Sequence, residues 1–199
     1  MIDKSIPHVA VLLVHKNPIE YPRYELPEGY RFESFRPGRE EDWVRIQVDS
    51  ELIENEEAAR NMIEKDFKYD PKGMTKRMWF VIDPEGRAVA TISMWQGGAF
   101  GPDHERVHWV AVEKSQQGRG LSNAMMTKAL DVYNEVGEGR SLFVHTQTWS
   151  FVAVSLYEKF GFVPYMGPKP MNWSAEADFE ADSIKGWGII REMQAKMKK

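Results

Sequence analysis

The sequence contains no cysteine, which excludes a disulfide framework, a thiolate metal site and a cysteine nucleophile. It also lacks a long apolar run, because the longest one, Val9 to Val14, is far too short to cross a bilayer. The amino terminus has neither the basic lead-in nor the small-residue cleavage site of a secretory signal. From these absences we expect a protein that does not associate with membranes and is located in the cytoplasm.

The sequence also has no excess of positively charged residues. The chain has 26 Lys and Arg residues against 30 Asp and Glu residues, a formal net charge of −4. This is the wrong sign for broad binding to a phosphate backbone, so nucleic acid is not expected as a partner. A chain of 199 residues can bury a core without a disulfide or a metal, and its 12% aromatic residues are enough to line a pocket besides.

Proline density predicts two parts of unequal size. Residues 1–27 are expected to form an extended N-terminal arm that includes a strand over His8–Val14, and residues 28–199 a single domain. The strand of the arm can add to the chain's own sheet or to a partner chain. A homodimer therefore stays open as one use of the arm.

Hydrophobic periodicity predicts a mixed α/β domain. Strands are expected over 30–35, 78–82, 88–95, 106–112, 141–146 and 162–165, and helices from 40, around 59–67, over 121–136 and over 153–160. The second helix is expected to end before a turn at 70–73. Strands 106–112 and 141–146 should be parallel, since a helix joins them. Residues 166–183 resemble a loop, and 184–193 fit a strand or a helix because Gly186 and Gly188 weaken both assignments.

The most informative segment runs from Val110 to Ser122, where a strand leads into a helix. The first-turn N–H groups of that helix lack partners and two glycines allow close backbone approach, so the segment predicts an anion site suited to a pyrophosphate. A P-loop is excluded because its Gly-x4-Gly-Lys-Ser/Thr pattern is absent. A dinucleotide fingerprint fails because Asn123 occupies its third glycine position and no acidic residue ends the next strand.

Two motifs instead resemble those of the GNAT superfamily, the acyl-CoA-dependent N-acetyltransferases. Residues 117–122, Gln-Gly-Arg-Gly-Leu-Ser, resemble its Gln/Arg-x-x-Gly-x-Gly/Ala signature, and residues 150–162 are similar to its Asn-x-x-Ala-x-x-x-Tyr-x-x-x-Gly-Phe segment. Ser122 replaces the usual final Gly or Ala but is small enough for close backbone approach. Ser150 replaces the usual Asn, which leaves the role of that position open. The resemblance covers roughly residues 28–166 in matching element order.

The resemblance implies a GNAT-like fold, an α/β structure with a central splayed mixed sheet flanked by helices. It also implies acetyl-CoA as co-substrate, no metal, and direct transfer of the acetyl group in a ternary complex to a primary amine of a small molecule or peptide. The residues expected to bind acetyl-CoA are Val110, Val112, Gln117, Gly118, Arg119, Gly120, Leu121, Ser122 and Ser150.

Tyr157 is the predicted catalytic acid. The resemblance implies that its hydroxyl reaches the thioester sulfur, and a phenol of pKa ~10 can donate a proton to a departing thiolate of pKa ~8.5. The alternative interpretation is core packing, because Tyr157 shares a helical face with Ala153 and Phe160.

His108 is the predicted base that takes the proton of the acceptor amine, since imidazole titrates near neutral pH. Strand alternation places Arg106, His108, Val110 and Val112 on one face, the face along which the thioester should lie. Glu105, His104 or a chain of waters are alternatives for the base. A histidine that is merely hydrogen-bonded beside the cleft is the remaining interpretation.

Residues 104–108 also spell His-Glu-x-x-His, the metalloprotease motif. The motif works on a helix, whereas in a strand its two histidines lie about 13 Å apart and cannot share a zinc ion, so a zinc hydrolase is only a remote alternative. A non-catalytic acyl-CoA-binding module is the main rival function. For the acceptor we expect a cationic amine with an apolar portion, held by acidic and aromatic residues. The candidates are Trp43, Asp49, Glu51, Glu54, Trp95, Phe100, Tyr165 and Trp173.

Overall fold

The computed structural model describes residues 2–67, 70–174 and 176–197. The chain forms two compact units. The terminal unit comprises residues 1–22, 95–107 and 136–199, and the central unit comprises residues 23–94 and 108–135. Among the described residues no helix is both long and apolar enough to span a bilayer.

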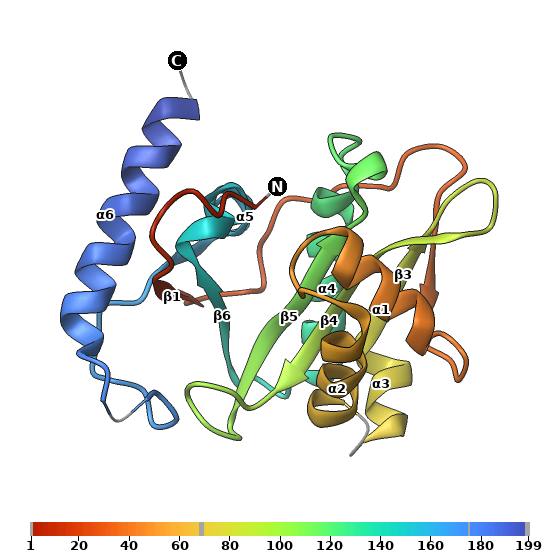
Figure 1. Ribbon diagram of the computed structural model, residues 1–199. Coiled ribbons are helices and arrows are strands. Elements are labelled where there is room, and N and C mark those ends of the chain that lie inside the picture. The colour runs from red at the N-terminus through yellow and green to blue at the C-terminus, as the bar shows by residue number, and fades with distance from the viewer. Residues whose placement is uncertain (1, 68–69, 175, 198–199) are drawn as a thin grey trace. The chain divides into compact units, whose positions relative to one another are not determined.

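The central unit is built on antiparallel strands covered by helices. Its strands are hydrogen-bonded in the order β2 (Arg31–Ser34), β3 (Met78–Ile82), β4 (Ala88–Gln96) and the second half of β5 (His104–Val112). In Figure 1, α1 (Glu40–Asp49) and α2 (Glu56–Asp66) lie in front of these strands and α4 (Leu121–Val136) lies behind them. β4 is buried from Ala88 to Trp95, as expected for a strand covered on both faces.

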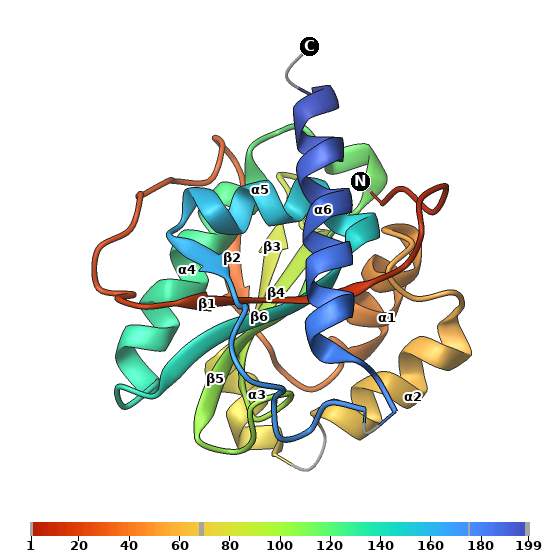
Figure 2. The same ribbon diagram turned by 90° about the vertical axis from the view of Figure 1, so that its left-hand side faces the viewer.

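The terminal unit contains the first half of β5 followed in hydrogen-bonding order by β6 (Ser141–Gln147), β1 (Ala10–His15) and β7 (Phe162–Pro164). β5 and β6 are parallel, as predicted, and β1 is antiparallel to both β6 and β7 (Figure 2). The strand of the arm therefore adds to the chain's own sheet. Helix α5 (Phe151–Lys159) and the long helix α6 (Phe179–Met197) complete this unit.

Helix α3 (Pro71–Arg77) was not predicted, because Asp70-Pro71-Lys72-Gly73 has the composition of a turn. In the structure the same residues begin a helix. The Asp70 side chain caps it by accepting a hydrogen bond of 2.8 Å from the Gly73 N–H, and Pro71 occupies the first helical turn, where a missing N–H costs nothing. A Cβ atom on Gly73 would collide with the Asp70 carboxylate, so the glycine is part of the cap.

The C-terminal segment is a helix, α6, that starts five residues before the ambiguous range 184–193. Gly186 made a helix uncertain from the sequence, yet it is the residue that brings α6 onto β1. A Cβ atom added at Gly186 would lie 2.7 Å from Val11 Cγ1 and 3.1 Å from Val9 Cγ1. At Gly188 an added Cβ atom would meet nothing within 4 Å.

These two glycines give a matched pair of substitutions. We expect Gly186→Ala to destabilise the protein by about 1–3 kcal/mol, because the methyl group would overpack against β1. Gly188→Ala should instead stabilise it by up to about 1 kcal/mol through helix propensity alone. Denaturant unfolding of both variants measures the difference, and equal effects of the two substitutions would contradict the packing of α6 described above.

Candidate active site

Strand β5 is irregular at Trp109, whose φ of +48° lies in the left-handed region that residues other than glycine rarely adopt. Such a residue breaks the alternation of side chains along a strand. As a result, His108 Nε2 and Trp109 Nε1 each lie 2.9 Å from the same atom, Asp66 Oδ2. The prediction of one continuous face from Arg106 to Val112 is therefore wrong from Trp109 onward.

Buried polar side chains hold the backbone at this irregularity. Ser93 Oγ on β4 donates a 2.8 Å hydrogen bond to the carbonyl of His108, and Gln47 Nε2 on α1 lies 3.4 Å from the carbonyl of Trp109. Ser93 is 2% exposed and Gln47 is fully buried. The carbonyl of the irregular residue and that of the residue before it thus each accept a hydrogen bond from a side chain.

The imidazole of His108 lies in a pocket of rings with one carboxylate. Its ring centroid is 5.5 Å from that of Phe67 and 5.3 Å from that of Trp109, and Asp66 is the charged group on Nε2. The His108 side chain is 14% exposed and that of Asp66 17%. The ring is therefore mostly shielded yet still reaches the surface, as a proton acceptor must.

The alternatives named for the base lie in different surroundings. Glu105 is fully buried and pairs with Arg140 at 3.2 Å, so its carboxylate serves an ion pair of the terminal unit. His104 stacks on Phe100, with 5.2 Å between ring centroids. Both histidines of the His-Glu-x-x-His string belong to β5, the strand geometry that cannot chelate zinc, and no metal-binding cluster of His, Asp or Glu occurs among the described residues.

The loop that leads from β5 into α4 has the backbone predicted for an anion site. Gly118 and Gly120 have φ values of +78° and +81°, and an added Cβ atom would meet nothing within 4 Å at either position. Glycine is needed here for conformation rather than for lack of space, and the space beside the loop is open. Helix α4 begins directly afterwards, at Leu121, without an acidic residue in its first turn. These features fit a pyrophosphate on the helix start.

Side chains fix this loop at both ends of the 3-10 turn Lys114–Gln116. Gln117 Nε2 donates a 3.1 Å hydrogen bond to the carbonyl of Val112, and the N–H of Lys114 donates one of 2.6 Å to Asp49 Oδ2. The Val112 carbonyl therefore already has a partner within the chain. The expected contacts of acetyl-CoA with the backbone of Val110 and Val112 stay a prediction.

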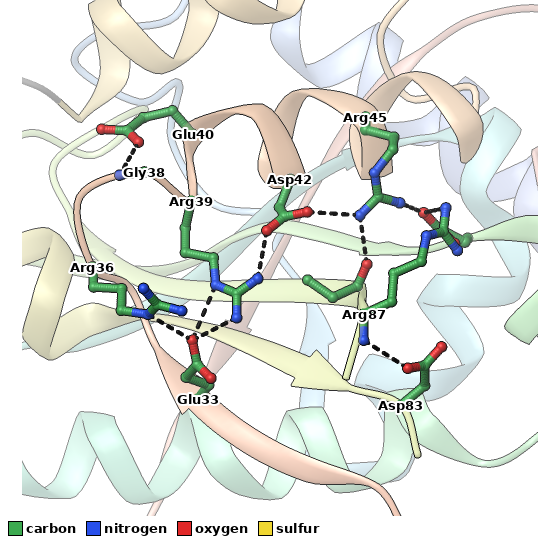
Figure 3. Close-up of polar contacts among 11 residues, drawn as sticks. Glu33, Arg36, Gly38, Arg39, Glu40, Asp42, Arg45, Asp83 and Arg87 are labelled. Carbon is green, nitrogen blue, oxygen red and sulfur yellow. Dashed lines mark hydrogen bonds and ion pairs between the residues drawn. The ribbon is translucent and has the colours of Figure 1, made fainter. Parts of the chain in front are cut away.

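A network of charged residues fixes the end of β5 where the loop starts (Figure 3). The nearly fully buried Glu113 accepts hydrogen bonds of 2.6 and 2.9 Å from Arg87 and also pairs with Arg45 of α1. Arg45 in turn donates to the carbonyl of Ala88 at 2.7 Å and to Asp42 at 2.9 Å. The loop is thus attached to α1 and to β4, rather than to its own residues alone.

The network continues through Arg39, which bridges Asp42 at 2.6 Å and Glu33 at 2.7 Å. The hydrogen bond from Arg39 lowers the pKa of Glu33. Burial opposes ionisation of Asp42, but hydrogen bonds from Arg39 and Arg45 outweigh it and lower the pKa of Asp42 as well. Because folding lowers both values, these carboxylates stabilise the fold fully above their unfolded pKa values, and the stabilisation is lost as the pH falls through the folded ones.

Tyr157 lies on α5 in the terminal unit and is 6% exposed. Its ring contacts that of Phe162, with 6.1 Å between centroids. Burial raises the pKa of the Tyr157 phenol above its usual value, which already lies well above neutral pH. Ser150, the other residue of this motif that we singled out, is buried, and its Oγ accepts a 3.1 Å hydrogen bond from Gln147 Nε2. Their roles toward acetyl-CoA stay predictions.

The set of residues expected to bind the acceptor is partly wrong. Trp43 is fully buried and Trp95 is 2% exposed, so both belong to the core rather than to a binding surface. Asp49 and Glu51 both contact Lys114. Phe100, Tyr165 and Trp173 pack as partly buried rings around a small cluster in the terminal unit.

Comparison with known proteins identifies the family. The model of the acetyltransferase (GNAT) family matches residues 40–162, and the chain belongs to this family. A mycothiol acetyltransferase from Thermobispora bispora is 28% identical over 153 residues, which are 71% of this chain and 49% of that protein. The sequence resemblance and the predicted α/β fold with a mixed sheet are thereby confirmed.

Solved structures agree on the fold. A GCN5-related N-acetyltransferase from Sphaerobacter thermophilus has a TM-score of 0.59 at 19% identity and covers 79% of this chain and 48% of its own. A GNAT-family acetyltransferase from Colwellia psychrerythraea has a TM-score of 0.59 at 10% identity, with coverages of 80% and 54%. A tandem GNAT protein from the clavulanic acid biosynthesis pathway has a TM-score of 0.58 at 16% identity. The match covers 82% of this chain and 52% of that protein. The chain spans about half the length of these relatives.

Sequence reasoning missed Asp66, Ser93 and Gln47, which surround the irregular residue of β5. One signal for Asp66 was available. It is the last residue of α2, where a negative charge opposes the helix dipole. Ser93 and Gln47 carry no such mark, because nothing in the sequence indicates which strand carbonyls their side chains reach.

Two neighbouring hydroxyls on β4 test the irregularity. Ser93→Ala should destabilise the protein by about 0.5–1.5 kcal/mol, since the carbonyl of His108 would lose the hydrogen bond from Ser93 Oγ. Thr91 is also buried, but its Oγ1 has no hydrogen-bond partner among the described residues. Thr91→Val should therefore be neutral or stabilising. Chemical denaturation compares the two variants, and a loss of stability in Thr91→Val as large as in Ser93→Ala would contradict this assignment.

Proposed function

We propose that the protein is an acetyl-CoA-dependent N-acetyltransferase that transfers an acetyl group to a primary amine of a small molecule or peptide. The observation that carries this proposal is the loop before α4, with two left-handed glycines beside open space and no acidic residue in the first helical turn. Membership of the acetyltransferase family and similarity to a mycothiol acetyltransferase support the reaction class.

The proposed reaction is a direct transfer. The free amine attacks the thioester carbon, the bond from that carbon to sulfur breaks, and CoA leaves as a thiolate that must be protonated. The absence of cysteine agrees with this route, because the chain has no thiol to carry the acetyl group. His108 takes the proton of the amine, and Tyr157, a phenol that is protonated at neutral pH, supplies one to the thiolate and regains a proton from solvent.

Release of CoA decides between this enzyme and a non-catalytic module that only binds acyl-CoA. The protein is incubated with acetyl-CoA and a panel of cationic, neutral and acidic amines, while calorimetry measures acetyl-CoA binding separately. Binding together with amine-dependent release of CoA supports the enzyme. Binding without release for every amine favours the module, and no binding contradicts both.

The loop glycines predict a selective loss of acetyl-CoA affinity. Gly120→Ala places a Cβ atom on a left-handed residue next to the proposed pyrophosphate, which costs roughly 1–2 kcal/mol of backbone strain and obstructs close approach. Gly86→Ala is a matched control, because Gly86 has a φ of +86° and equally open surroundings in the turn between β3 and β4. Both variants should lose similar stability, but only Gly120→Ala should bind acetyl-CoA more weakly. Equal affinities would remove the loop from the binding site.

Substitution of Tyr157 separates its two interpretations. Tyr157→Phe keeps the buried ring, so the fold and the affinity for acetyl-CoA should change little. If the hydroxyl protonates the leaving thiolate, kcat should fall by roughly 100-fold, the lower end of what a positioned acid contributes. Steady-state kinetics and a melting curve of the same preparation measure both, and an unchanged kcat would leave Tyr157 a packing residue.

A further inference from the structure

The charge of Asp66 opposes the dipole of its own helix. Asp66 ends α2, where a carboxylate meets the partial negative charge of the unpaired helix carbonyls. Its side chain is only 17% exposed, so part of its hydration is lost too. These costs are offset by hydrogen bonds from His108 and Trp109 in β5, which both end on Asp66 Oδ2.

The chemistry of the three groups fixes the state of the imidazole. An ionised carboxylate only accepts hydrogen bonds, and an indole N–H only donates. A neutral His108 must therefore donate its Nε2–H to Asp66, which leaves the lone pair on Nδ1. Trp109 holds the same oxygen from a second direction at 2.9 Å, so the carboxylate is restrained as well.

We propose that Asp66 is a positioning residue for catalysis: it keeps Nδ1 of His108 as the basic nitrogen and stabilises the imidazolium that forms there. This inference rests on the proposed function and deepens it. When the acceptor amine loses its proton, the proton goes to Nδ1 while Nε2–H stays on Asp66. The carboxylate remains ionised, the ring carries one positive charge next to one negative charge, and the proton later leaves Nδ1 for solvent.

The pairing of His108 and Trp109 with Asp66 depends on the irregularity of the strand. On a regular strand His108 and Trp109 would point to opposite faces and could not reach one oxygen. The left-handed conformation of Trp109 brings both N–H groups to Asp66, and the ring of Phe67 borders the imidazole. The strained residue and the acid at the helix end are thus two parts of one arrangement.

Asp66→Asn tests the proposal because it preserves shape and removes the charge. The pH titration of the His108 ring, followed by nitrogen-detected NMR, should move to lower pH, while the other histidines serve as internal references. kcat/KM should fall by roughly 10- to 100-fold, part of what a positioned base contributes, and the acidic limb of its pH profile should move to lower pH with the ring. Glu57→Gln, which removes an exposed carboxylate from the same helix, should change neither.

Two further variants keep the outcomes distinct. Asp66→Glu retains the carboxylate and should keep the ring titration near that of the wild type, even if Asp66→Asn folds poorly. An unmoved titration of His108 in Asp66→Asn, or a loss of activity in Asp66→Glu equal to that in Asp66→Asn, would overturn the positioning role. If His108→Ala keeps the acidic limb of the parent, the base in the proposed function is wrong. The NMR titration measures the effect of Asp66 on the protonation of the His108 ring, and this effect can be tested whether or not His108 is the base.

Discussion

The left-handed backbone at Trp109 is the constraint around which the contacts of the candidate site are arranged. A non-glycine residue in this conformation costs of order 1–3 kcal/mol and persists only where its surroundings determine it. Here the surroundings come from separate elements: Ser93 on β4, Gln47 on α1 and Asp66 on α2 each provide a polar contact to residue 108 or 109. The strain is therefore maintained by the packing of the helices on the sheet. The same packing places the His108 imidazole next to Asp66.

Much of the fold follows from local patterns, and the exceptions have physical reasons. The spacing of apolar residues predicted the strands and most helices, because burial of one face is a local property of a sequence. Helix α3 was missed because Asp-Pro-x-Gly suits both a turn and the capped start of a helix. Gly186 made the prediction of α6 uncertain. The reason for a glycine there is its close contact with Val11, a residue far away in the sequence.

The candidate site divides in the same way. The glycine loop could be predicted because its conformation is encoded in the residues themselves. The side-chain directions on β5 could not, because nothing in the residue type of Trp109 indicates a positive φ. Asp66 lay outside the prediction for a related reason, since its partner His108 comes from another element. Trp43 and Trp95 show the opposite error, because rings suited to a binding surface are equally suited to a core.

The position of β1 bears on how the chain folds. β1 comes early in the sequence, but both of its neighbours, β6 and β7, follow the last residue of the central unit. During synthesis the central unit can be complete while β1 still has two unpaired edges, and closing so long a loop makes this pairing a late, slow step. Until β6 and β7 have been made, the apolar stretch of β1 is open to pairing with other chains.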